Sequence, residues 1–367
     1  MLRNWVILLA ASTALTAPGH AATVPLPEVV GDTFSAFVPR HDGRDNRLDY
    51  SVWTEALAAF VVSMGPPLRK MPVAIAPPIG SRVKFGPQSM YRLDGSLVGF
   101  TLIDREVMGN IGRYRRELEA VAETLDIPAL PRNEQLAYWI NLHNVAMVEK
   151  IGEEWPIRQP REIMVDGVPL DDARFVTVRG VSLSLRDIRE KIVFAHWKDP
   201  VVIYGFWRGE IGGPAIQRAA FDGREISAQL ESSAREFINS RRGTEKRGDT
   251  LHVSRFYAEM APFYFPDLEA DLRAHLARYA EGPVIDMLAD TGVIMASIYE
   301  HDIADLSGGR RSNPFFASGR LDVGADIVLQ ERERKFEYIR RTQPRTSIVT
   351  FSNIDLPGDP PNKGEVE

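Results

Sequence analysis

Two asparagines and a histidine lie within one helical turn of each other in a stretch that is otherwise apolar. Asn141, His143 and Asn144 fall where apolar residues recur every three or four positions. This spacing predicts a helix over residues 132–151, buried over a wide arc, with the three polar side chains in or beside that arc. A buried amide must be hydrogen-bonded, because leaving one unpaired costs about 1–3 kcal/mol. The asparagines therefore either bind a ligand or clamp neighbouring backbone, and His143 is either a base or a satisfied core histidine.

A second group of candidates lies in a glycine-rich segment, where Arg208 and Glu210 are followed by Gly212 and Gly213. A guanidinium binds a carboxylate or a phosphate through two parallel hydrogen bonds, and glycines allow the backbone to come close to a ligand. We therefore predict that Arg208 and Glu210 bind a ligand together with the two asparagines. The alternative is a surface turn held by a salt bridge. The segment is not a phosphate-binding Walker loop, because no Lys-Ser or Lys-Thr follows the glycines. Residues 201–204, just before it, are predicted to form a short buried strand.

The remaining catalytic chemistry is limited by composition. The chain has no cysteine, which excludes disulfides, thiolate metal sites and a thiol nucleophile. No histidine-rich zinc motif, no carboxylate-rich metal loop and no serine-nucleophile motif is present, so we predict no metal and no cofactor. His143 and His252 are the candidates for a general base. His301 and Asp302 are neighbours, and in a strand their side chains would point apart.

The N-terminus is typical of a secretory signal. Arg3 supplies a positive charge, residues 5–17 carry none, and Gly19 and Ala21 offer small residues at the two positions that a signal peptidase recognises. We therefore expect residues 1–21 to be removed and the mature protein to be periplasmic or secreted. An uncleaved anchor is the alternative. No later run of about 18 apolar residues follows, so we expect no transmembrane segment after cleavage.

Charge and pattern indicate the fold class and limit the partners. The net charge is −6, and −7 without residues 1–21, which argues against nucleic-acid binding. Helical patterns alternate with short β-prone runs, and Asp166-Gly167 is a hairpin-turn signal. This predicts an α+β fold, with mixed helices packed on a mainly antiparallel sheet in a single main domain. We place an N-terminal extension at residues 22–48, the domain at 49–306 and a C-terminal extension with a partly disordered tail at 307–367.

Residues 134–145 read Glu-Gln-Leu-Ala-Tyr-Trp-Ile-Asn-Leu-His-Asn-Val. They resemble the buried helix that is the hallmark of the domain of unknown function 547, a family found in bacterial envelope proteins and in plants. His143 stands where the family usually has a tyrosine. Three weaker blocks agree in order, namely Asp49-Tyr50, residues 183–188 and residues 298–302. The resemblance covers residues 49–306.

The chain departs from the family after Asp199-Pro200. Typical members carry a histidine there, followed by a segment with two cysteines, and these residues look suited to thiol chemistry. In an ungapped alignment, Ile203 replaces the histidine, while Arg208 and Gly213 replace the two cysteines. A cysteine-dependent activity carried over from the family is therefore excluded at this site.

Three functions remain open. The leading hypothesis is an exported, non-catalytic protein that binds a peptide-like or glycan-like envelope ligand near Asn141, Asn144 and Arg208. The alternative is a hydrolase or transferase that acts on such material with a histidine base. A third hypothesis is an envelope scaffold whose basic segment, residues 310–345, docks a protein partner. Acidic residues are interleaved with the basic ones there, which also fits a solvated helix.

Overall fold

The computed structural model describes residues 33–40, 45–69, 86–311 and 322–342. The expected signal segment and the end of the C-terminal tail lie outside these residues. The helices are α1 (Ser51–Phe60), α2 (Arg105–Thr124), α3 (Arg132–Glu154), α4 (Phe194–His196), α5 (Ile226–Asn239), α6 (Phe256–Tyr264), α7 (Leu268–Tyr279), α8 (Pro283–Ala289) and α9 (Val323–Thr342).

The strands are short and form four small sheets in the described part of the chain. Three are antiparallel pairs, and the fourth has the order β7-β8-β9, in which β8 and β9 run parallel. The strands are β1 (Val61–Ser63), β2 (Ser96–Val98), β3 (Met164–Val165), β4 (Val168–Pro169), β5 (Arg174–Val178), β6 (Val181–Ser184), β7 (Thr244–Arg247), β8 (Thr250–Ser254) and β9 (Val293–Ile298).

The predicted α+β class is confirmed, with small sheets in place of one larger sheet. Two of the pairs are tight hairpins. In the first, Asp166 and Gly167 both have positive φ, and in the second Arg179 and Gly180 do. Two-residue turns of this kind reverse the chain direction, so the two strands of each pair bond to each other and form a separate two-stranded sheet. The core forms around a helix instead of a central sheet.

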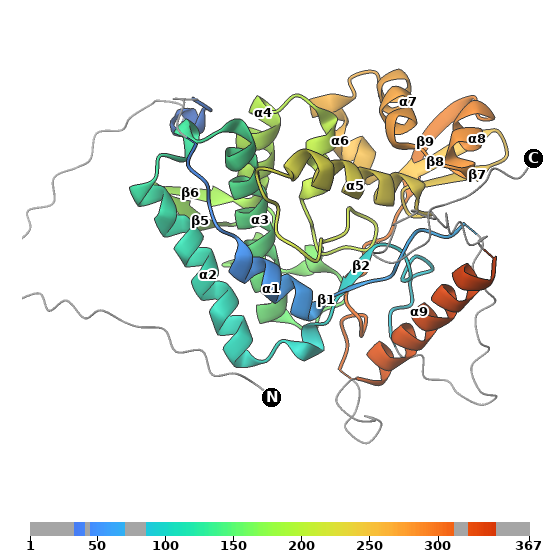
Figure 1. Ribbon diagram of the computed structural model, residues 1–367, viewed down its shortest axis with the longest axis horizontal. Helices are drawn as coiled ribbons and strands as arrows, with labels where there is room; N and C mark the ends of the chain where they lie inside the picture. Colours follow the sequence, from blue (N-terminus) through green and yellow to red (C-terminus); the bar gives the residue numbers. More distant parts are fainter. Residues whose placement is uncertain (1–32, 41–44, 70–85, 312–321, 343–367) are drawn as a thin grey trace, which may run out of the picture.

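That central helix is α3, which α2 accompanies along its length (Figure 1). Every residue from Glu134 to Glu149 is buried, including the polar ones. The helix predicted at residues 132–151 is confirmed and continues to Glu154. Burial on all sides explains why apolar residues occur on every face of this helix, because a helix with neighbours all round has no solvated face.

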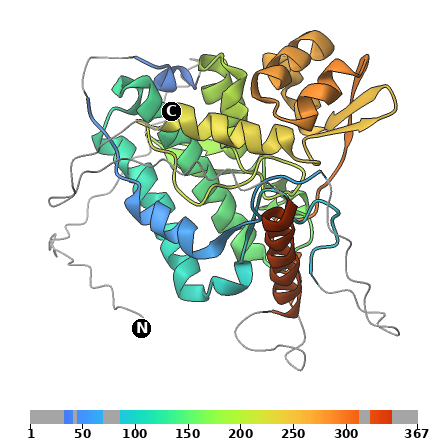
Figure 2. The same cartoon turned by 45° about the vertical axis from the view of Figure 1, so that its right-hand side comes forward.

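The C-terminal extension contributes α9, which stands beside the rest of the molecule (Figure 2). Its Lys335 is buried and donates from Nζ to the carbonyl of Leu93 at 2.6 Å. Glu331 accepts two hydrogen bonds from Arg92, at 2.6 and 2.7 Å. This helix is therefore docked through charged residues, whereas interleaved charge alone favoured a solvated helix. No helix among the described residues combines the length and the apolar character needed to cross a membrane.

Candidate functional site

The segment that carries Arg208 is held by the buried helix α3. Residues 201–204 were predicted to form a strand, but they lie in a 3-10 helix, Pro200–Gly205. Asp199 caps this helix by accepting a hydrogen bond from the backbone N–H of Val201 at 3.0 Å, and the proline fixes the first turn. These local signals outweigh the β-prone side chains that follow.

Asn144 holds the backbone at the C-terminal end of this 3-10 helix. Its Nδ2 donates to the carbonyl of Gly205 at 2.9 Å, and its Oδ1 accepts from the backbone N–H of Trp207 at 3.0 Å. Asn141 clamps the backbone of Phe221 in the same way, at 2.8 and 3.0 Å. These contacts are the ones expected if the asparagines clamp neighbouring backbone. Direct ligand binding by the two asparagines stays a prediction, and Asn144 supports the loop that presents Arg208.

His143 is sealed inside the molecule and bonded at both ring nitrogens. Its Nε2 lies 3.0 Å from Nη1 of Arg189, which can only donate, so Nε2 accepts and the ring proton lies on Nδ1. Nδ1 then donates to Oδ1 of Asn144 at 3.0 Å. Burial, followed by the charge of Arg189, lowers the pKa of His143 to about 3. These contacts favour the core-histidine alternative over a base.

Arg189 links this buried network to the molecular surface. Its two terminal nitrogens donate to both oxygens of Asp171, at 2.7 and 2.6 Å. The guanidinium is almost fully buried, whereas Asp171 is 21% exposed. Burial opposes the charge of Asp171, but the guanidinium of Arg189 outweighs it and holds the carboxyl pKa well below its usual value.

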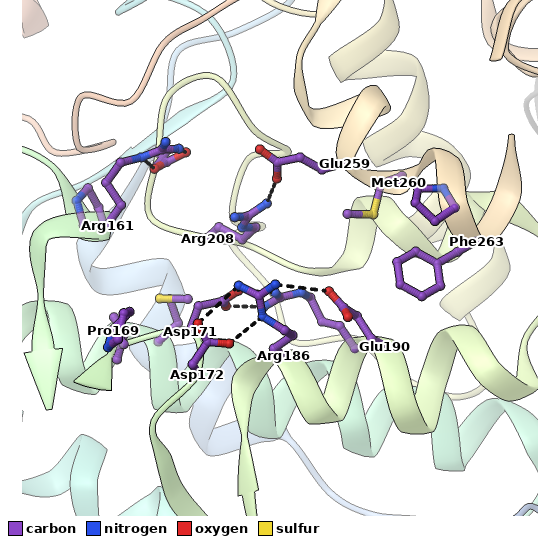
Figure 3. A pocket seen from close by; sticks show the side chains of 16 residues that line it. Arg161, Pro169, Asp171, Asp172, Arg186, Glu190, Arg208, Glu259, Met260 and Phe263 are labelled. Atoms are coloured by element: carbon purple, nitrogen blue, oxygen red, sulfur yellow. Dashed lines mark hydrogen bonds and ion pairs between the residues drawn. The ribbon is translucent and has the colours of Figure 1, made fainter. Parts of the chain in front are cut away.

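Asp171 and Arg189 form part of the wall of a cleft with a volume of about 540 Å³ (Figure 3). This volume is within the range of about 300–1,000 Å³ that is usual for small-molecule sites. One part of the wall is apolar and the other is charged. The apolar part includes Met147, Leu170, Met260, Pro262 and Phe263. The charged part has four guanidinium groups and five carboxylates, from Arg161, Arg186, Arg189, Arg208, Asp171, Asp172, Glu190, Glu210 and Glu259.

Arg208 lies in the middle of the cleft view, paired with Glu259 of α6 (Figure 3). Burial opposes its charge, but the carboxylates of Glu259, Asp171 and Glu210 outweigh burial and raise the pKa of the guanidinium. Arg208 is therefore a permanent cation, and its side chain is 22% exposed. The structure thus brings together two of the predicted site residues, Arg208 and Glu210.

Glu210 lines both the cleft and a smaller recess, and His301 lines that recess together with Arg208. Arg161 donates two hydrogen bonds to Glu210, at 2.7 and 2.9 Å, and Nδ1 of His301 lies 3.4 Å from the same carboxylate. Burial would raise the pKa of Glu210, but the hydrogen bonds from His301 and Arg161 and the charge of Arg208 lower it.

The sequence contained no signal for the role of His301, because its acidic partner is 91 positions away. His252, the other predicted base, lies on β8 and faces Ser297, 2.5 Å from its Oγ. It is not part of the cleft wall. Within the described residues, no group of three or more His, Asp or Glu side chains is arranged to hold a metal ion.

Residues 127–238 match a known family, described as "Protein of unknown function, DUF547". This segment belongs to that family. No curated protein and no solved structure matches the chain. The DUF547 segment contains the core of the site, including α3, Asp171, Arg189 and Arg208. The other side of the cleft, with Glu259 and the apolar residues of α6, follows the matched segment in the sequence.

Proposed function

We propose that this chain is an exported, cysteine-free DUF547 protein of the bacterial envelope that binds a peptide-like ligand in the cleft around Arg208. Export is proposed from the N-terminal sequence pattern, and binding from the cleft. The observation that carries the binding proposal is the exposure of Arg208, a permanent cation, inside a cleft of ligand size.

The mixture of charge and apolar surface favours a peptide over a glycan. A neutral sugar that entered the cleft would remove water from guanidinium and carboxylate groups without offering opposite charges, and such desolvation is costly. A peptide offers charged ends, amide groups and apolar side chains. Phe263, which is 37% exposed, and the neighbouring Met260 provide a surface for such a side chain.

Binding can be tested on the full chain by isothermal titration calorimetry, with a set of synthetic tripeptides and a set of chitin oligosaccharides. We expect the tripeptides to bind and Arg208→Gln to weaken them at least about tenfold, because a charge-assisted hydrogen bond contributes about 1.5–3 kcal/mol. Arg113→Gln on the exposed face of α2 is the matched control and should leave affinity unchanged. Binding of the oligosaccharides alone would indicate that the ligand is a glycan and not a peptide. Binding of neither set, or unchanged peptide affinity in Arg208→Gln, would contradict the proposal.

The second candidate function is hydrolysis or group transfer with a histidine base, and the His301–Glu210 pair favours it. A carboxylate that accepts from Nδ1 orients the imidazole and leaves Nε2 to take a proton from water. Arg208, which lines the same recess, would stabilise negative charge that develops on a carbonyl oxygen.

If this second function operates, the full chain should release amines from tripeptides at a measurable rate. His301→Gln should lower that rate at least about 100-fold, the usual contribution of a general base. His252→Gln should leave it unchanged, since this histidine lines neither the cleft nor the recess that His301 lines. A rate that is equal in both variants would assign the turnover to a contaminant or to another group.

A further inference from the structure

The guanidinium groups of the cleft differ in how many of their N–H groups are already used. Arg161 donates from two nitrogens to Glu210, and Arg189 donates from both terminal nitrogens to Asp171. Arg208 uses one nitrogen, on Glu259, in the contacts that the described residues make. Since a guanidinium carries five N–H donors, Arg208 keeps more of them unused than Arg161 or Arg189 does.

The carboxylates differ in the same way. Asp172 lies 2.7 Å from Nε of Arg186, in a close ion pair. Glu190 lies 3.9 Å from the same arginine, and the described residues give it no hydrogen bond. Its side chain is 22% exposed. Glu190 is therefore the carboxylate of the wall with the most unused acceptor capacity.

The apolar surface lies beside Glu190. Figure 3 shows Phe263 and Met260 on the same side of the cleft as Glu190, with Arg208 between them and Arg161. A ligand that spans Arg208 and Glu190 therefore meets the apolar wall at its Glu190 end. The wall holds five carboxylates against four guanidinium groups, so a ligand with one charge of each sign leaves the balance unchanged.

We infer that the ligand is a short peptide with two free ends, whose carboxylate binds Arg208 and whose ammonium group binds Glu190. The side chain of its first residue then packs on Met260 and Phe263. This inference rests on the proposed binding function and adds the class and the orientation of the ligand.

The test uses three probes with the full chain in isothermal titration calorimetry: phenylalanyl-alanyl-alanine, its C-terminal amide and its N-acetyl derivative. We expect the amide and the acetylated peptide each to bind about 10- to 100-fold more weakly than the free tripeptide, since each loses one charge-assisted contact. Arg208→Gln should weaken the free tripeptide by the same factor and leave the amide unchanged. Glu190→Gln should weaken the free tripeptide and leave the acetylated peptide unchanged. This pairing of variant and probe isolates each contact.

Equal affinity for all three probes would overturn the assigned orientation and leave peptide binding standing, whereas no binding of any tripeptide would overturn the proposed function itself. Weakening of the acetylated peptide but not of the amide by Glu190→Gln would contradict the contact between Glu190 and the ammonium group and also overturn the inference. If Arg208→Gln fails to fold, the comparison of the three probes on the unaltered chain decides, with Arg208→Lys as the second variant. Lysine keeps the charge and loses the planar fork, so it should retain part of the preference for the free carboxylate.

Discussion

Lowering the pH from 7 to 5 is expected to reduce the free energy of unfolding by about 4 kcal/mol through two buried histidines. His143 accepts a hydrogen bond from Arg189, and His275 stacks on Tyr204, whose hydroxyl lies 2.9 Å from its Nε2. Burial is the main cause that lowers their pKa values from 6.5, to about 3 for His143 and about 4 for His275.

The sign follows from where the protons bind. Below pH 6.5 the unfolded chain takes up a proton on each histidine, and the folded chain does not until the pH approaches 4 for His275 and 3 for His143. The unfolded state therefore gains stability as the pH falls through this window, and each histidine contributes about 2 kcal/mol at pH 5. Asp171 has a lowered pKa and acts only below this window, as its carboxyl becomes protonated.

Urea denaturation at several pH values measures this effect. Buried carboxyls with raised pKa, such as Asp94 and Asp305, act in the opposite direction and are common to all variants. The histidine contribution is therefore the difference between the natural chain and the variants His143→Gln and His275→Gln. Each variant should lose about 2 kcal/mol of the acid sensitivity, and an unchanged pH profile in both would contradict the assignment.

The buried helix was predictable because its signal is local. Its apolar positions recur within one segment, so periodicity alone located α3, and the requirement that buried amides be paired indicated that Asn141 and Asn144 have partners. Which partners they have depends on residues 61 to 80 positions away, and no local pattern encodes that choice.

The cleft, too, was only partly predictable, because local patterns do not show which distant residues come together. Arg208 and Glu210 were identifiable from residue type beside glycines. Arg189 and Glu259 were not, because a charged residue in a helix is usually solvated and only the tertiary fold buries or pairs it. Residues 201–204 were assigned wrongly, since their β-prone side chains were weighted above the Asp-Pro start of the 3-10 helix. Export and ligand binding stay predictions.

Arg189→Met is expected to lower the free energy of unfolding by about 3–4 kcal/mol, near the lower end of the usual cost of breaking a buried ion pair. The methionine fills much of the space but removes both hydrogen bonds to Asp171 and the one to Nε2 of His143. The cost is at the lower end because Asp171 is 21% exposed and keeps some water.

Arg186→Met is the matched control, because Arg186 lies three positions earlier and also forms an ion pair with Asp171, but it is 47% exposed. Exposed pairs contribute about 0–1 kcal/mol, so this variant should stay within about 1 kcal/mol of the natural chain. The double variant Arg189→Met/Asp171→Met removes both charges. Its loss of unfolding free energy should be smaller than the sum of the losses in the two single variants. Urea denaturation at pH 7 measures all of these values. If Arg186→Met cost as much as Arg189→Met, exposure would not decide the strength of these pairs. The link from α3 through Arg189 to the cleft would then lose its energetic basis.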